Sequence, residues 1–277
     1  IASGEVAIDT SAQKLYINDS GTVKEIGGSG GGSGASTGET YVLLKDGATA
    51  SNSGTNTIAG YLAGDAFSGS PAGNTFYGYE SGTSVTSASG VTAVGQGAMF
   101  SQTTGGYSTG IGYKAGLANT ANWTVAVGAE CLQANTSGTK NTAVGGMAAR
   151  SNTTGTNNVA LGYEALKGNT TASNNTAVGK DSLKALTTAH YNTSVGSGAG
   201  TALTTGWENT LVGYAALDYA TTAEKNCAFG VHAGGSVETA SGGVYIGHES
   251  ATGLTTGSYN TIVGTGCGHD ITTGTYN

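Results

Sequence analysis

The sequence predicts an all-β protein: a trimeric parallel β-solenoid (a β-roll or β-helix) of 17-residue repeats, preceded by a small β-meander. Two observations predict the solenoid. A motif that ends in glycine recurs at nearly constant spacing, and large apolar residues are scarce. Leu, Ile, Val and Phe together supply 44 of 277 residues, whereas glycine alone supplies 50. A chain this poor in large apolar groups cannot build one thick core, so it must stay disordered or repeat a thin core many times.

The N-terminal part differs from the rest of the chain. Residues 1–26 are predicted to form the meander and to act as an attachment segment, because apolar pairs alternate between turn signals. These pairs are Val6/Ile8, Leu15/Ile17 and Val23/Ile26. Residues 27–38, with the sequence GGSGGGSGASTG, are predicted to be a flexible linker. Residues 39–55 are expected to cap the start of the solenoid, and residues 56–277 to form its shaft.

A short motif, most often Asn-Thr-x-Val-Gly, defines the repeats. The intervals between its glycines are 17 residues, except the first, which is 18, and the fourth, which is 16. The thirteen repeat glycines are Gly60, Gly78, Gly95, Gly112, Gly128, Gly145, Gly162, Gly179, Gly196, Gly213, Gly230, Gly247 and Gly264. With one strand spacing of ~4.8 Å per coil, they predict a rod of roughly 60 Å. Because Asn277 stands where another repeat would open, we expect the solenoid to continue beyond it.

The residues before each glycine predict a short strand. The residue directly before it is β-branched or apolar in most repeats, as at Val144 and Val178, and a Thr or Val stands two residues earlier. The residue between them is usually small, as at Ala143 and Ala177, and faces the other way. We expect both faces of the strand to be buried, one against the chain's own coil and the other against something else.

The third residue after each glycine is always Ala, Ser or Cys, which indicates close approach of backbones, as at a tight turn or an axis. The predicted close-approach residues are Ala98, Ala115, Cys131, Ala148, Ala165, Ser182, Ala199, Ala216, Ala233 and Ser250. Cys131 and Cys267 behave here as small apolar residues, and Cys227 takes a strand position. All three are expected to be core-facing free thiols, since they lie in well-separated coils.

The core composition predicts trimerisation. Most repeats offer one firm aliphatic residue before the glycine and a variable second one, as at Leu132 and Leu166. Such a core is too thin for one chain, whereas three parallel copies could approach closely and bury the second strand face between them. This hypothesis places Ala165 where three chains crowd and leaves Glu164 facing solvent.

The repeats resemble those of a known group of surface fibres. The units NNTAVGKDSLKALTTAH (174–190) and NTLVGYAALDYATTAEK (209–225) are similar to repeats of trimeric autotransporter adhesin heads, and more closely resemble the NTAVG-type repeats of bacteriophage tail-fibre proteins. The first 26 residues look like a segment often found near the N-terminus of phage tail fibres and related virion proteins.

The resemblance implies a function for the chain. It implies a parallel homotrimer that forms the structural shaft of a virion tail fibre, binds other tail proteins through its N-terminal segment, and takes part in host-cell attachment. A host-surface glycan or protein receptor is a candidate partner. The alternative is the head of a bacterial trimeric adhesin, which would be located on the cell surface.

Composition argues against other functions. With Lys+Arg at 10, Asp+Glu at 17 and no basic cluster along the sequence, no nucleic-acid partner is expected. No apolar stretch approaches the ~20 residues of a membrane span, so no membrane insertion is expected. No catalytic, cofactor-binding or metal-ligating set is predicted, and the chain is not expected to be an enzyme. A carbohydrate-degrading enzyme on a solenoid remains the class-distinct alternative.

Two sets of surface residues remain to be interpreted. Acidic residues recur two positions after the repeat glycine, and we interpret this column as a solvated face rather than as the paired carboxylates of a glycosidase. They are Glu80, Glu130, Glu164, Asp181 and Glu249. Aromatic residues flank the motif and would suit stacking on sugars, or equally cover the small-residue core. They are Tyr61, Tyr79, Tyr113, Tyr163 and Tyr214 after glycines, with Tyr107, Trp123, Tyr191, Tyr259 and Tyr276 in the preceding turn.

Overall fold

The computed structural model describes residues 6–9, 14–19, 22–26, 56–67 and 71–277. The described residues are all-β and contain no helix, and so none that is long and apolar enough to cross a membrane. Strands β1 (Val6–Asp9), β2 (Lys14–Asp19) and β3 (Thr22–Ile26) pair as an antiparallel sheet in chain order. The predicted linker, 27–38, and the predicted cap, 39–55, lie outside the described residues.

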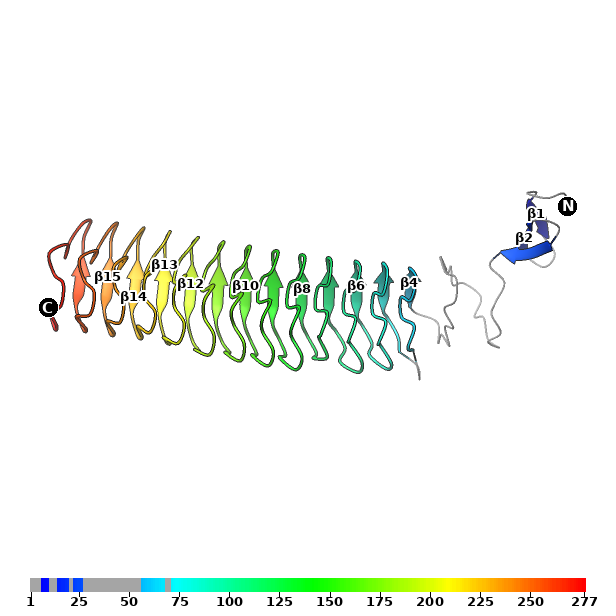
Figure 1. The fold of residues 1–277 in the computed structure, drawn as a ribbon, viewed down its shortest axis with the longest axis horizontal. Coiled ribbons are helices and arrows are strands. Elements are labelled where there is room, and N and C mark those ends of the chain that lie inside the picture. Colours follow the sequence, from blue (N-terminus) through cyan, green and yellow to red (C-terminus); the bar gives the residue numbers. More distant parts are fainter. Residues whose placement is uncertain (1–5, 10–13, 20–21, 27–55, 68–70) are drawn as a thin grey trace.

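The repeats form a parallel β-solenoid, as predicted. Its sheet has thirteen strands in chain order, stacked along the long axis of the rod (Figure 1). The strands are β4 (Thr57–Ala59), β5 (Thr75–Tyr77), β6 (Thr92–Val94), β7 (Thr109–Ile111), β8 (Val125–Val127), β9 (Thr142–Val144), β10 (Val159–Leu161), β11 (Thr176–Val178), β12 (Thr193–Val195), β13 (Thr210–Val212), β14 (Cys227–Phe229), β15 (Val244–Ile246) and β16 (Thr261–Val263).

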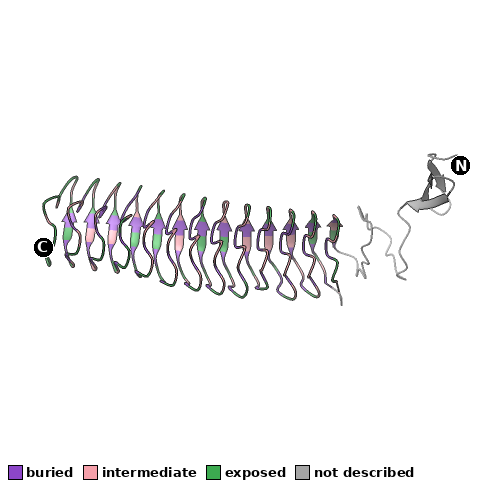
Figure 2. Cartoon of the chain, viewed as in Figure 1, coloured by how far each residue is buried: buried purple, intermediate pink, exposed green. Residues whose placement is uncertain are grey.

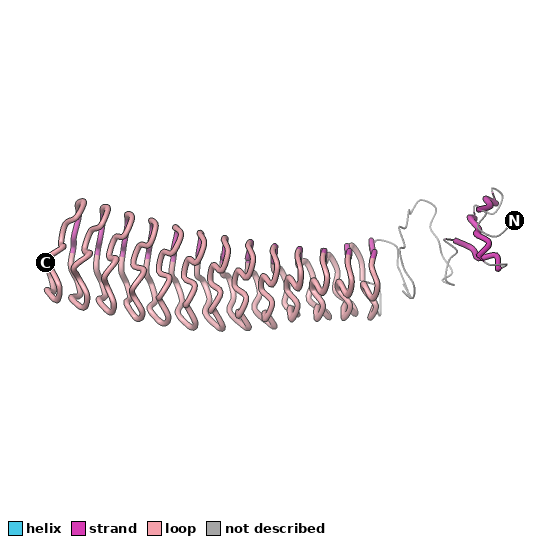
Figure 3. Tube along the Cα trace, turned by 45° about the horizontal axis from the view of Figure 1, so that its top comes forward, coloured by secondary structure: helices cyan, strands magenta, loops and turns pink. Residues whose placement is uncertain are grey.

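Each coil stacks on its equivalent in the next coil. In the sheet, Ala143 pairs with Ala160 and Ala160 with Ala177. The hydrogen bonds between coils continue outside the three-residue strands, which form only a short part of each coil (Figure 3). The Leu166 N–H donates to the Ser182 carbonyl at 3.0 Å, and the Gly168 N–H to the Lys184 carbonyl at 2.8 Å. Backbone groups are therefore satisfied around much of the coil without helices.

The repeat glycines lie where successive coils approach most closely. Gly162 has φ +136°, a region that L side chains rarely adopt. A Cβ atom there would lie 2.6 Å from both the carbonyl carbon and the carbonyl oxygen of Gly179 in the next coil. The other repeat glycines from Gly60 to Gly247 have similar φ angles and similarly short distances to the next glycine. The column leaves no room for a side chain at this corner.

The interior of each coil is filled by side chains of its own chain. The middle residue of each strand points inward and is usually alanine, and the fourth residue after the glycine, such as Leu166 or Leu183, is fully buried beside it. Where the middle residue is large, nearby glycines make room for it. A Cβ atom on Gly82 would lie 2.7 Å from the Phe76 ring, and one on Gly243 would lie 2.0 Å from the Tyr245 hydroxyl. The volume of each layer is thus conserved.

A ladder of buried asparagines runs along one inner edge of the sheet. The asparagine of the Asn-Thr-x-Val-Gly motif points inward, and its Oδ1 accepts the backbone N–H of the equivalent residue one coil later. For Asn158, Asn175 and Asn192 as donors, these distances are 2.9, 3.0 and 2.9 Å. The Nδ2 group of Asn158 donates to the Ala172 carbonyl at 2.8 Å. Sequence reasoning missed this role, although the recurrence of Asn in most repeats could have indicated it.

A second inner column changes character halfway along the rod. Seven residues after the repeat glycine, Asn152 donates to Asn135 Oδ1 and Asn169 donates to Asn152 Oδ1, each at 2.7 Å. One coil later the column becomes aliphatic, with Leu186 and then Leu203 fully buried. Asn169 Oδ1 therefore has no hydrogen-bond partner among the described residues. The same backbone accepts an amide ladder or an aliphatic column, but the junction leaves one acceptor unpaired.

We predict that Gly162→Ala lowers the free energy of unfolding by roughly 2 kcal/mol or more, because the left-handed backbone penalty adds to a clash with Gly179. The matched control is Gly198→Ala. Gly198 has φ +71° and no atom within 4 Å of its Cβ position, so this variant carries only the backbone penalty. Urea unfolding followed by circular dichroism measures both. Equal losses would contradict the close approach of coils at the glycine column.

Candidate functional site

The small residues predicted for close approach lie inside their own coil. Ala165 is fully buried, and its N–H donates to the Gly162 carbonyl at 3.3 Å, closing a tight turn. Ala148 closes the equivalent turn on Gly145 at 3.2 Å. The other predicted close-approach residues, from Ala98 to Ser250, are also fully buried within the single chain. Of the two predicted alternatives, a tight turn and an axis, the structure shows the tight turn. Ala165 is buried inside its own chain and so does not lie at a contact between three chains.

The outer face of the parallel sheet is the surface left for contact. Residues alternate along the strands, so from β5 to β16 the middle residue is buried and its neighbours are exposed or half-buried (Figure 2). The inner face is buried within the chain's own coil, whereas the outer face, predicted to be buried against something else, is open in the single chain. The exposed large apolar residues of the column before the glycine are Tyr77, Ile111, Leu161, Val195, Phe229, Ile246 and Val263.

Aromatic side chains border this face on both sides. The ten aromatic residues singled out from the sequence are all exposed, five in the column after the glycine and five in the turn before the strand. Two pairs stack along the rod, Tyr61 on Tyr79 with ring centroids 5.9 Å apart, and Tyr259 on Tyr276 at 5.0 Å. Among the described residues, the exposed large apolar side chains lie on the strand face or these borders, except Trp207 and Tyr219. Exposed apolar side chains thus recur along this side of the rod, between threonines of the strands and polar residues of the borders.

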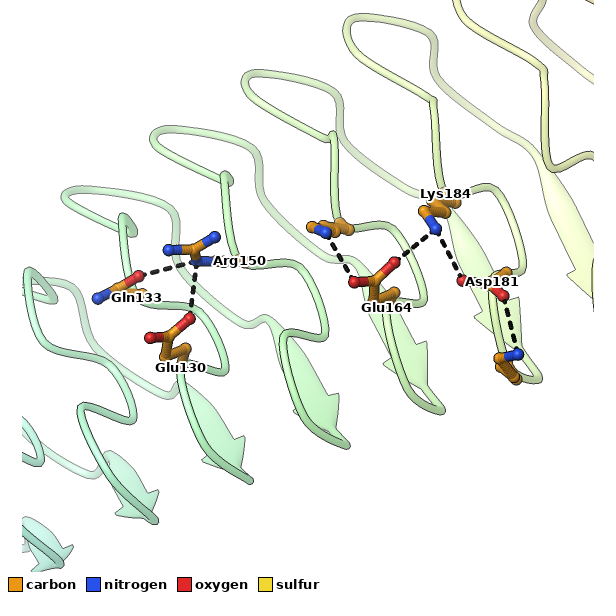
Figure 4. A network of polar contacts seen from close by, with 8 residues as sticks. Glu130, Gln133, Arg150, Glu164, Asp181 and Lys184 are labelled. Atoms are coloured by element: carbon orange, nitrogen blue, oxygen red, sulfur yellow. Dashed lines mark hydrogen bonds and ion pairs between the residues drawn. The ribbon is translucent and has the colours of Figure 1, made fainter.

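A charged network lies after the strands, across four successive coils (Figure 4). Arg150 contacts Glu130 at 3.1 Å and Gln133 at 2.9 Å. Glu164 contacts Lys167 at 2.7 Å and Lys184 at 2.5 Å. The network arises because the second and fifth residues after each glycine face one another within a coil and between coils. This pairing was missed at the sequence level, although the 17-residue period combined with those two positions could have indicated it.

The position of Glu164 differs from two predictions. The acidic column was predicted to be a solvated face, and the Glu164 side chain was predicted to face solvent. Only 9% of its side chain is exposed, and its hydrogen bonds to Lys167 and Lys184 lower its pKa from 4.5 to about 2. The other acidic residues of the column, Glu80, Glu130, Asp181 and Glu249, are half-buried or exposed. The carboxylate of Glu164 therefore stays ionised and holds two ammonium groups in place.

The groups with catalytic potential are not gathered into a site in the described part of the chain. No group of three or more His, Cys, Asp or Glu residues there could hold a metal ion. Burial raises the pKa of the Cys131 thiol and of the Tyr245 phenol to about 12, so both stay protonated at neutral pH. All three cysteines are free thiols.

The expectation that all three cysteines face the core is wrong for two of them. Cys131 is buried, whereas Cys227 is half-buried because it lies on the outer strand face. Cys267 is exposed because it lies in the last described coil, where no later coil covers it. The interior position alone therefore does not bury a residue unless a neighbouring coil follows.

The chain was compared with known proteins. It matches no protein-family model, and neither a curated protein sequence nor a solved structure shows significant similarity to it.

We predict that Glu164→Gln lowers stability in a pH-dependent way. Because the folded-state pKa lies below 4.5, the ionised carboxylate stabilises the fold above that pH, and this contribution declines as the pH falls through about 2. The free energy of unfolding at pH 7 should fall by about 1–2 kcal/mol, allowing for screening of the half-exposed lysines. Urea unfolding at pH 7 and pH 2 measures the difference, which should nearly vanish at the lower pH. Glu249→Gln, with a side chain 55% exposed, is the control and should change neither value.

Proposed function

We propose that the chain is part of the structural shaft of a bacteriophage tail fibre that takes part in host-cell attachment. The observation that supports this best is a rod of thirteen stacked coils whose outer strand face carries exposed apolar side chains from end to end, beside a column that is mostly threonine. Exposed apolar surface of this extent is characteristic of protein interfaces. The role is mechanical and adhesive rather than catalytic, and the NTAVG-type resemblance supports a viral owner.

The shaft is a parallel homotrimer in this proposal. A face about 60 Å long and about 15–20 Å wide offers about 1,000 Å² per chain, comparable to the ~800 Å² per partner of stable interfaces. When the rotation axis of the trimer runs parallel to the rod, each coil lies at the same height as the equivalent coil of the other chains. Each repeat then contacts the same repeat of its neighbours. Three copies is the number that the family resemblance implies. The apolar column that includes Leu161 and Val195 forms the contact.

The N-terminal segment supplies the attachment to the particle in this proposal. Residues 1–26 form the β-meander that binds other virion tail proteins, and β1, β2 and β3 are its strands. The solenoid then holds the receptor-binding surface at a distance from the particle.

We predict that antibodies raised against the chain label the tails of virions in electron micrographs of the source particle. Label on a bacterial envelope, with none on virions, would contradict the proposal and favour a bacterial adhesin head. Release of reducing ends from host polysaccharide by the purified chain would contradict both, and would favour the enzyme alternative.

The three cysteines provide a test of the trimer. Sedimentation equilibrium should give three times the 27.0 kDa chain mass. A thiol reagent should label Cys267, leave Cys131 unmodified, and label Cys227 slowly, because the proposed contact covers the outer strand face. Mass spectrometry locates the modified residues. A monomeric mass with fast labelling of Cys227 would be incompatible with the trimer.

Matched variants locate the contact. Leu161→Arg and Val195→Arg on the strand face should dissociate the trimer and speed the labelling of Cys227. Thr188→Arg, at an exposed turn away from that face, should leave both unchanged.

A further inference from the structure

The basic residues of the solenoid are concentrated in one stretch. Residues 140–184 contain five of its seven Lys and Arg residues and only two acidic residues. By contrast, residues 185–277 contain six acidic residues and one lysine, and the whole chain carries a net charge of −7. The stretch is therefore a local basic island on an acidic rod, where an anionic ligand would be favoured.

Carboxylates fix the lysines of this island in position. Glu164 holds Lys167 and Lys184, while Asp181 contacts Lys184 at 3.2 Å and Lys180 at 3.5 Å (Figure 4). Three ammonium groups share two carboxylates, so one positive charge is left over. Each ammonium has three N–H donors, and these ion pairs do not use them all. Much of the entropy that a free lysine would lose on binding has already been lost.

Two of these lysines, Lys167 and Lys184, line an open hollow on the surface. An open hollow of about 500 Å³ is lined by side chains that include Ser151, Lys167, Asp181, Lys184 and Thr201. Hydroxyl, ammonium and carboxylate groups from successive coils therefore converge on one hollow. A polyhydroxylated ligand could exchange hydrogen bonds with all of them.

An exposed aromatic ring belongs to Tyr163, the residue directly before Glu164 in the chain. The Tyr163 side chain is 46% exposed, and its ring lies over Gly146 of the preceding coil, 3.4 Å from the position of a Cβ atom there. Lys180 follows Tyr163 in the same column of the next coil, and the Asp181 N–H donates to the Tyr163 carbonyl at 2.9 Å. The exposed ring offers an apolar face to a sugar ring, and Lys180 occupies the next position of its column.

We propose that Tyr163, Lys167, Lys180 and Lys184 form a binding site for an acidic polysaccharide, with a sugar ring on Tyr163 and its carboxylate or sulfate group at the lysines. The inference rests on the proposed role in host attachment and names the chemistry of the receptor. A nucleic acid fits less well, because its charge every ~1.7 Å would extend over the acidic coils that follow. An acidic polysaccharide has more widely spaced charges, suited to a site one to three coils long.

Titration calorimetry of the full chain at low salt tests the site with three polymers. Polygalacturonate presents carboxylates, dextran sulfate presents sulfates, and dextran is neutral. We expect binding to at least one acidic polymer, weakened by added salt because the contacts are ionic, and none to dextran. The pair of acidic polymers identifies which anion is preferred. Equal binding of dextran, absence of binding to both acidic polymers, or tighter binding of duplex DNA would overturn the proposal.

Matched variants localise the site. Lys180→Gln removes a charge whose side chain is 65% exposed, and Tyr163→Ala removes the exposed ring, so both should fold. Each should weaken binding by about threefold to tenfold, and the two together more strongly. Lys225→Gln, which removes a lysine 4.6 Å over the Trp207 ring, and Tyr214→Ala, in the same column as Tyr163, are the controls and should leave affinity unchanged. Equal losses in the controls would refute the assigned location.

The outcomes separate this inference from the proposed function. A trimer on virion tails that ignores acidic polysaccharides would overturn the binding site alone. A monomer that binds them through these residues would retain the site and overturn the fibre.

Discussion

The stacking of each coil on its own equivalent is the constraint on which this structure depends. Hydrogen bonds between coils fix their separation, so every residue meets the residue one period later. Equivalent positions of successive coils therefore have similar surroundings, and similar residues recur along each column of equivalent positions. Where backbones approach most closely, only glycine fits, as at Gly162 under Gly179. Where an inward polar group finds its partner one coil later, asparagine can repeat indefinitely, as at Asn158 and Asn175.

This constraint explains how a chain with few large apolar residues can fold. Alanine, one aliphatic residue and one or two amides fill each layer, and the amides are satisfied by the coils on either side. Buried amides cost little when every donor and acceptor is paired, and the cost becomes visible only where a ladder ends, as at Asn169. Much of the larger apolar surface is therefore left outside, on side chains such as Leu161 and Phe229.

The repeat length, the strand positions and the solenoid could be predicted from the sequence, because period and alternation depend on local order alone. The inward direction of the motif asparagine could not be predicted so easily, since Asn and Thr at the ends of a strand usually indicate turns. Counting large aliphatic residues also underestimated the core, because it ignored the amides and alanines beside Leu166. Glu164 was misplaced for a different reason. Its lysine partners, Lys167 and Lys184, come from two coils, and only the folded register brings both to one carboxylate.

The interior columns are formed by one chain, so the outer strand face rather than the core is the surface that an assembly would use. The inward columns need no partner, whereas the outer strand face is costly to leave in water along the whole rod. A partner that follows the same period can cover it at every coil, and a second copy of the chain has that period by construction. The charged network of Glu164 and Lys184 lies after the strands rather than on that face, so its column is not part of the contact that the strand face would make. One period thus yields two different surfaces, an outer strand face with a column of apolar side chains and a charged surface after the strands.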